Sequence, residues 1–288
     1  MGVFNLPHQN QGHSQRSVLI ENFEIPGGSG QIPVRLYRPD TGKLIAGPQS
    51  ELLPVVLYFH GGGFIGGTLD DADVPAQFIA GQCPAAVLSV GYSLAPERPF
   101  PAAPEDAYAA TEWVLANGKT LQVDPLRLAV AGDDAGGNLA ACLMLIARDR
   151  NASPIAAQVL IGPMLDPSMT QLGDAARLKS DLSAETCADC YRQYLPRILQ
   201  RMHPYASPME SRRLSGLPPA FVATAECDVL HNEAEKYAAA LIAVGVHTQV
   251  ARYAGIKHAD LRSHPPLLAE VVAFLRRRLY PAGNANNS

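Results

Sequence analysis

The stretch RLAVAGDDAGGNLAACLMLIARD, residues 127–149, joins a short apolar run to a helical pattern through one tight turn. An apolar run of this kind is typical of a strand that is covered on both faces. Gly132 and Gly136 stand two positions on either side of Asp134, and small residues there let a strand and the following helix cross closely. The stretch therefore predicts a strand, a sharp turn centred on Asp134, and a helix over 135–149.

Short β-rich runs alternate with helical patterns along the rest of the chain. The β-rich runs are residues 31–37, 55–59, 86–90, 157–161, 220–224 and 248–253, and the helical patterns are residues 104–116, 231–244 and 265–279. Strands that alternate with helices favour βαβ units. We therefore expect an α/β fold with a mostly parallel central sheet and helices on both faces.

The polar segment 168–206 interrupts this alternation. An insertion at this point would cover the carboxyl ends of the strands, where open α/β sheets bind ligands. We interpret the segment as a helical cap, joined by the N-terminal stretch up to about residue 45. The chain, 1–288, is then one domain with cap elements at about 1–45 and 168–206.

Composition narrows the choice of partner. The chain has 23 Lys and Arg against 27 Asp and Glu, a net charge of −4, and so lacks the cationic excess that nucleic acid requires. No apolar run is long enough to span a bilayer, and the N-terminus lacks the basic-then-apolar pattern of a signal peptide. These features favour a cytoplasmic protein that binds a small molecule, and they are compatible with a homodimer.

Cysteines and histidines give no metal-binding pattern. The five cysteines are an odd number in a chain large enough to fold without disulfides, which favours a reducing compartment. Cys187 and Cys190 form an isolated C-x-x-C, which we interpret as structural because no second ligand pair accompanies it. No pair of histidines has the H-E-x-x-H spacing. We expect neither a metal nor a cofactor.

A second glycine-rich element, HGGGF at residues 60–64, directly follows a β-rich run. Three consecutive glycines lower stability because they lose much backbone entropy on folding. They are expected where another group approaches the backbone closely or where backbone N–H groups must stay accessible. The H-G-G-G pattern is the type of loop that forms the oxyanion hole in lipases and esterases. Gly61, Gly63 and Gly66 also fit the dinucleotide fingerprint G-x-G-x-x-G, but the next predicted strand runs into Gly91 rather than an acidic residue.

Asp134 stands where the G-x-S-x-G nucleophile elbow has its serine. A simpler interpretation is that Asp134 only caps the helix that follows, a role that Asp fills well. Both roles are compatible, since Asp is one of the few residues that tolerate a left-handed backbone.

Five blocks in order resemble the hormone-sensitive-lipase family of α/β-hydrolases, over about residues 30 to 278. They are FHGGGFIGG (59–67), YSLAPERPFPAAPEDAYAATEWV (92–114), VAGDDAGGNLAA (130–141), LPPAFVATAECDVLHNEAEKYAAAL (217–241) and RYAGIKHAD (252–260). The resemblance implies the α/β-hydrolase fold and the hydrolysis of short-chain carboxylic esters in an apolar pocket.

The resemblance also implies the residues of the site. The catalytic residues would be Asp134 at the elbow, Asp228 as the acid and His258 as the base, with an oxyanion hole formed by the backbone N–H groups of Gly62, Gly63 and Ala135. That order along the chain is the one that α/β-hydrolases use. The chain departs from the family at Gly91-Tyr92-Ser93, Val229 and Ala259, and above all at Asp134 in place of serine.

Aspartate at the elbow changes the expected chemistry. An adduct of Asp134 with an ester would carry a carboxylate leaving group of pKa about 3.9, which is expelled far more easily than an alkoxide, so the adduct reverts. Ester hydrolysis is then impaired. Three alternatives remain open: attack by Asp134 on an epoxide or alkyl halide, a ligand receptor whose oxyanion hole holds the carboxylate itself, and a serine enzyme inactivated by substitution.

Overall fold

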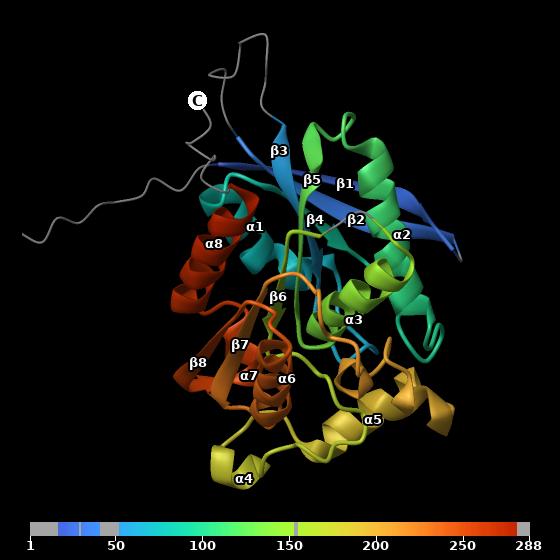
Figure 1. Cartoon of the computed structure of the whole chain (residues 1–288), viewed down its shortest axis with the longest axis vertical. Helices are drawn as coiled ribbons and strands as arrows, with labels where there is room; N and C mark the ends of the chain where they lie inside the picture. Colours follow the sequence, from blue (N-terminus) through green and yellow to red (C-terminus); the bar gives the residue numbers. More distant parts are fainter. Residues whose placement is uncertain (1–16, 29, 41–51, 153–154, 281–288) are drawn as a thin grey trace, which may run out of the picture.

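The structure is a computed structural model that describes residues 17–28, 30–40, 52–152 and 155–280. These residues form an eight-stranded sheet in the order β1-β2-β4-β3-β5-β6-β7-β8 (Figure 1). The strands are β1 (Val18–Gly27), β2 (Gly30–Pro39), β3 (Leu53–Phe59), β4 (Ala86–Val90), β5 (Val123–Asp133), β6 (Ala157–Ile161), β7 (Ala220–Cys227) and β8 (Thr248–Lys257). Strands β3 to β8 pair in parallel, whereas β2 pairs antiparallel with both β1 and β4. The predicted mostly parallel sheet is confirmed.

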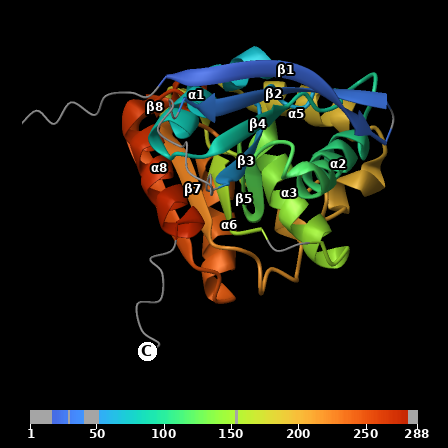
Figure 2. The same ribbon diagram turned by 90° about the horizontal axis from the view of Figure 1, so that it is seen from above.

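Helices cover both faces of this sheet (Figure 2). The longer ones are α1 (Asp73–Gln82), α2 (Ala102–Asn117), α3 (Ala135–Asp149), α6 (His231–Ala243) and α8 (Pro265–Leu279). Helices α1 and α8 bury their apolar residues in one core, and α2, α3 and α6 in the other. The prediction of helices on both faces is confirmed.

Strand β3 shows why the central runs are apolar throughout. Val55, Leu57 and Phe59 point into the core beneath α2 and α3, whereas Val56 and Tyr58 point into the core beneath α1 and α8. Successive side chains of a strand face opposite sides of its sheet, so a strand covered on both sides is apolar at every position.

The N-terminal stretch differs from its predicted place. We assigned residues up to about 45 to the cap, but the described part forms β1 and β2, a hairpin at the edge of the sheet in which Val18 pairs with Pro39 and Gly27 with Gly30. The backbone of β2 pairs on to β4, which fixes the hairpin in the sheet. Residues 1–16, 29 and 41–45 lie outside the described part.

Short helices fill the segment 168–206. They are α4 (Ala175–Leu178), α5 (Ala184–Tyr194) and the 3-10 helix η3 (Ile198–Met202). Asp174 and Ser183 cap the first two helices by accepting hydrogen bonds from backbone N–H groups. In Figure 1 this segment lies at one end of the molecule, beyond the carboxyl ends of the parallel strands. Among the described residues, no helix is long and apolar enough to cross a membrane.

Candidate functional site

Asp134 occupies the turn between β5 and α3 in a strained backbone conformation, with φ 53° and ψ −117°. Its carbonyl oxygen accepts hydrogen bonds from the N–H groups of Asn138 and Met164, both at 3.2 Å. A Cβ atom at Gly136 would overlap the carbonyl oxygen of Phe59, so the crossing of strand and helix requires glycine there. The backbone holds Asp134 at the tip of a sharp turn, as the sequence predicts.

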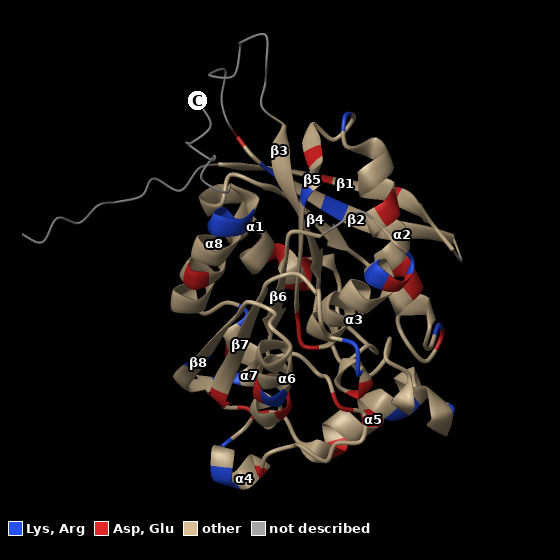
Figure 3. Ribbon diagram, in the orientation of Figure 1, with Lys and Arg blue, Asp and Glu red and all other residues tan. Residues whose placement is uncertain are grey.

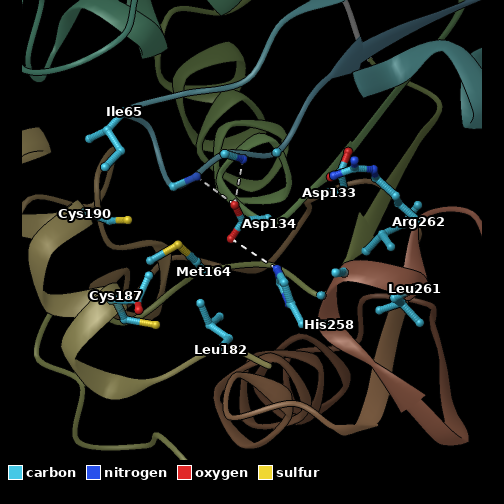
Figure 4. Close-up of a pocket in the computed structure, with 17 residues that line it drawn as sticks. Ile65, Asp133, Asp134, Met164, Leu182, Cys187, Cys190, His258, Leu261 and Arg262 are labelled. Atoms are coloured by element: carbon cyan, nitrogen blue, oxygen red, sulfur yellow. Dashed lines mark hydrogen bonds and ion pairs between the residues drawn. The ribbon is translucent and has the colours of Figure 1, made fainter. Parts of the chain in front are cut away.

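The glycine loop after β3 lies directly over this turn (Figure 4). The N–H groups of Gly62 and Gly63 donate hydrogen bonds to Oδ2 of Asp134, at 2.9 and 2.8 Å. Asp134 makes no capping hydrogen bond to α3, so helix capping by its side chain is ruled out. One carboxylate oxygen of Asp134 therefore occupies the position where the two amides would hold an oxyanion.

His60 and Tyr92 support the glycine loop from behind. The two rings stack with centroids 4.4 Å apart, and the Tyr92 hydroxyl donates a hydrogen bond to the carbonyl oxygen of His60 at 2.8 Å. Burial lowers the pKa of His60, more than its hydrogen bond to Gly61 and the nearby carboxylates raise it. A neutral, stacked His60 fixes the loop that presents the amides of Gly62 and Gly63.

His258 follows β8 and lies between two aspartates. Its Nδ1 atom is 2.8 Å from Oδ2 of Asp228, and its Nε2 atom is 3.7 Å from Oδ1 of Asp134. Asp228 is fully buried, and its Oδ1 atom accepts a hydrogen bond from the N–H of Leu230 at 3.0 Å. The backbone N–H of His258 donates to Asp181 of the cap at 3.1 Å. The imidazole is thus fixed from both its ring and its backbone.

These carboxylates favour the protonated form of His258. Burial lowers the pKa of the imidazole, but Asp228, Asp134 and Asp133 raise it further, to about 9. At neutral pH His258 is therefore an imidazolium that pairs with Asp228 and Asp134. In this form it has no free lone pair with which to accept a proton.

The structure brings together five of the six residues that the sequence predicts for the site. Gly62, Gly63, Asp134, Asp228 and His258 are joined by the contacts described above. Ala135 begins α3 and lies buried beside Asp134, but the two hydrogen bonds to Oδ2 come from the glycines.

Asp133 is a site residue that sequence reasoning missed. It is buried in the pocket wall, where its Oδ1 atom accepts a hydrogen bond from the Tyr58 hydroxyl at 2.8 Å and Arg262 lies 3.9 Å from its Oδ2 atom. Burial raises the pKa of Asp133 to about 6, although Arg262 and Tyr58 oppose the shift. Its place beside Asp134 in the GDDAGG motif was the available signal.

A cavity of about 370 Å³ opens in front of Asp134. Its apolar wall is formed by the segment 61–65, the loop after β6, helix α5 with the residues just before it, and helix α7 (His258–Leu261). The apolar side chains that line it are Ile65, Met164, Leu182, Cys187, Cys190 and Leu261. The two thiols of the C-x-x-C are free and buried in this wall. Sequence reasoning gave these cysteines no place in the pocket, because the path of the cap cannot be inferred from its pattern. Among residues 17–28, 30–40, 52–152 and 155–280, no cluster of three His, Cys, Asp or Glu side chains could hold a metal ion.

Comparison with known proteins gives one family. A model described as the α/β hydrolase fold matches residues 56–261. The chain is 40% identical over 236 residues to Esterase LipI of Mycobacterium tuberculosis, covering 80% of this chain and 71% of that protein. It is 36% identical over 238 residues to an ethyl acetate hydrolase of Pseudomonas putida, covering 80% of this chain and 72% of that protein.

Solved structures agree with the sequence matches. The chain superposes on a hyperthermophilic esterase from the archaeon Pyrobaculum calidifontis with a TM-score of 0.81 and 39% identity, over 91% of this chain and 84% of that one. It superposes on EstE1, a thermostable carboxylesterase cloned from a metagenomic library, with a TM-score of 0.85 and 36% identity, over 93% of this chain and 92% of that one.

Proposed function

The chain belongs to the α/β-hydrolase family, as a carboxylic ester hydrolase, and from that premise we propose that its pocket binds short-chain esters but hydrolyses them poorly. In this proposal Asp134 stands at the nucleophile position, Asp228 orients His258, and the amides of Gly62, Gly63 and Ala135 form the oxyanion hole. The apolar walls of the cavity suit a small acyl or alkyl group.

Two hydrogen bonds, from the amides of Gly62 and Gly63 to the carboxylate of Asp134, are the observation that carries this proposal. Catalysis of acyl transfer needs amides that are free to bind the oxygen where negative charge develops. Here the amides of Gly62 and Gly63 already donate to Oδ2 of Asp134, at 2.9 and 2.8 Å. A substrate carbonyl must displace a charge-assisted hydrogen-bond pair before it can be polarised. Ester turnover is slow for this reason.

Two further effects act in the same direction. Attack of Asp134 on an ester carbonyl gives an adduct that expels the carboxylate in preference to the alkoxide, so the acyl-enzyme does not accumulate. His258, with its pKa raised to about 9, is protonated at neutral pH and cannot take a proton from water. The amides already bound to Asp134, the easily expelled Asp134 carboxylate and the protonated His258 therefore each slow ester hydrolysis.

The test is Asp134→Ser, assayed with p-nitrophenyl butyrate. The serine variant is expected to gain about 100-fold or more in kcat/KM, because a freed oxyanion hole is worth roughly that factor. His258→Ala in the same background is the control, and it should abolish the gain. High activity of the unchanged chain that is lost in Asp134→Ser would refute the proposal.

Attack on saturated carbon is a second candidate, favoured by the orientation of the Asp134 carboxylate. Oδ2 is held by the amides, while Oδ1 points toward His258 at 3.7 Å. Oδ1 would form a bond to an epoxide carbon as the C–O bond breaks, and the released oxygen would take the proton of the His258 imidazolium. Neutral His258 would then deprotonate a water that attacks Cγ of Asp134, with negative charge on Oδ2 in the oxyanion hole. The Cγ–Oδ1 bond would break as this adduct collapses, Oδ1 would leave as a hydroxyl group of the product protonated by His258, and the carboxylate would be restored with the oxygen from water.

Isotope labelling separates this candidate from a receptor. A single turnover of styrene oxide in oxygen-18 water places the label in the Asp134 carboxylate if the alkyl-enzyme forms, because water attacks Cγ. A ligand receptor shows no label, while its melting temperature rises with ligand concentration. Mass spectrometry of the peptide that contains Asp134 measures the label.

A further inference from the structure

Residues 192–203, which follow from the end of α5 through η3, project apolar side chains into solvent. Ile198 is 71% exposed, Leu199 82% and Met202 61%. Figure 1 shows this part of the chain at the periphery of the molecule, beside α5. Single exposed apolar residues are common, but three within one short helix of five residues need an explanation.

The inner side of the segment is well anchored. The buried ring of Tyr194 stacks on Phe64 with centroids 3.8 Å apart, and Leu195 is buried next to it. The Gln200 side chain donates a hydrogen bond to the carbonyl oxygen of Phe100 at 3.3 Å. The exposed side chains are therefore presented outward from a fixed backbone.

The same segment is basic. Residues 192–203 contain Arg192, Arg197 and Arg201 and no Asp or Glu, although the whole chain carries a net charge of −4. Arg197 is exposed, and the Arg192 side chain is 64% exposed beside its ion-pair partner Asp189. In Figure 3 basic residues lie at this edge of the cap. An apolar ridge flanked by arginines is the combination that suits an anionic lipid surface.

We infer that Ile198, Leu199 and Met202, with Arg192 and Arg197, form a surface that docks reversibly on anionic lipid bilayers. The apolar side chains would enter the boundary between headgroups and acyl chains while the guanidinium groups meet lipid phosphates. Self-association through a twofold axis fits less well, since it would place this basic surface against a second copy of itself. Because α5 also contributes Cys187 and Cys190 to the cavity, docking would bring the cap of the pocket to the bilayer, where apolar esters dissolve.

Co-sedimentation with large unilamellar vesicles in 0.1 M NaCl tests this inference. The full chain is expected to bind vesicles of phosphatidylcholine with about 30% phosphatidylglycerol, and to bind pure phosphatidylcholine at least tenfold more weakly. The triple variant Ile198→Ser, Leu199→Ser, Met202→Ser should lower the partition coefficient about tenfold or more. The pair Arg192→Gln, Arg197→Gln should lower binding to the anionic vesicles and weaken its dependence on salt.

Leu126→Ser is the matched control, since Leu126 is 72% exposed in β5, away from η3. It should bind like the unchanged chain, and all variants should keep the same melting temperature because the altered side chains are exposed. Failure of the unchanged chain to bind, equal binding to both vesicles, or an equal loss in Leu126→Ser would overturn the inference. So would lipid-free sedimentation in which the unchanged chain is a dimer and the triple variant a monomer. Ester hydrolysis plays no part in these measurements, so they are independent of the proposed function.

Discussion

Two aspartates face the same imidazole from opposite sides, and their surroundings give them different properties. Asp228 is fully buried, with one oxygen 2.8 Å from Nδ1 of His258 and the other bound to a backbone N–H. Asp134 has one oxygen bound to two glycine amides and the other 3.7 Å from Nε2. Asp228 thus holds the ring at Nδ1, whereas Asp134, in the proposed function, fills the space in which a substrate would react. Residue type alone does not set the role of a carboxylate in this site.

The largest effect that we expect from this difference between the two aspartates is the loss of kcat on replacing Asp228. In the Asp134→Ser background, Asp228→Asn should lower kcat for p-nitrophenyl butyrate roughly 10³- to 10⁴-fold, because the imidazole loses its partner and its correct tautomer. Asp124→Asn is the control, since Asp124 pairs with Arg127 near the start of β5 and does not line the pocket, and it should leave kcat unchanged. A loss of less than tenfold in Asp228→Asn would mean that Asp228 does not orient the base.

The pKa of His258 shows how strongly each of the two aspartates acts on the imidazole. Both carboxylates raise it, Asp228 more strongly, so we expect it to fall from about 9 in Asp134→Asn and further in Asp228→Asn. Titration of the imidazole resonances by NMR measures each value. An unchanged pKa in Asp134→Asn would show that Asp134 does not pair with the imidazolium.

A smaller effect is expected on stability. The pKa of His258 is raised from 6.5 to about 9 by folding, so its stabilising contribution is complete below pH 6.5 and disappears as pH rises through 9. The free energy of unfolding of the unchanged chain should therefore fall over this range relative to that of Asp134→Asn. Urea unfolding at pH 6, 7.5 and 9 measures the difference, and a constant difference would contradict the predicted linkage.

The elbow and the glycine loop could be predicted because backbone geometry restricts their sequence. Gly136 admits no side chain next to Phe59, and Asp134 must tolerate a positive φ, so few residue types fit. The central strands were equally evident, since a strand buried on both faces is apolar throughout. Such positions carry a strong signal because local sterics dictate the residue.

The cap and the edge hairpin could not be predicted in the same way. Most side chains of β1 are exposed, so its sequence does not alternate regularly between apolar and polar residues. Its pairing with β2 could therefore not be predicted from the sequence pattern. Cys187 and Cys190 reach the cavity only through the path of α5, which depends on tertiary packing. Contacts between distant segments of this kind are not encoded in local periodicity.

The amide protons of Gly62 and Gly63 test most directly whether the Asp134 carboxylate fills the oxyanion hole. A charge-assisted hydrogen bond to a carboxylate moves an amide proton resonance downfield. We predict that both resonances lie downfield in the unchanged chain and move upfield in Asp134→Ala, in proton–nitrogen correlation spectra. Resonances that stay in place after the substitution would contradict the occupied hole and the proposed impairment with it.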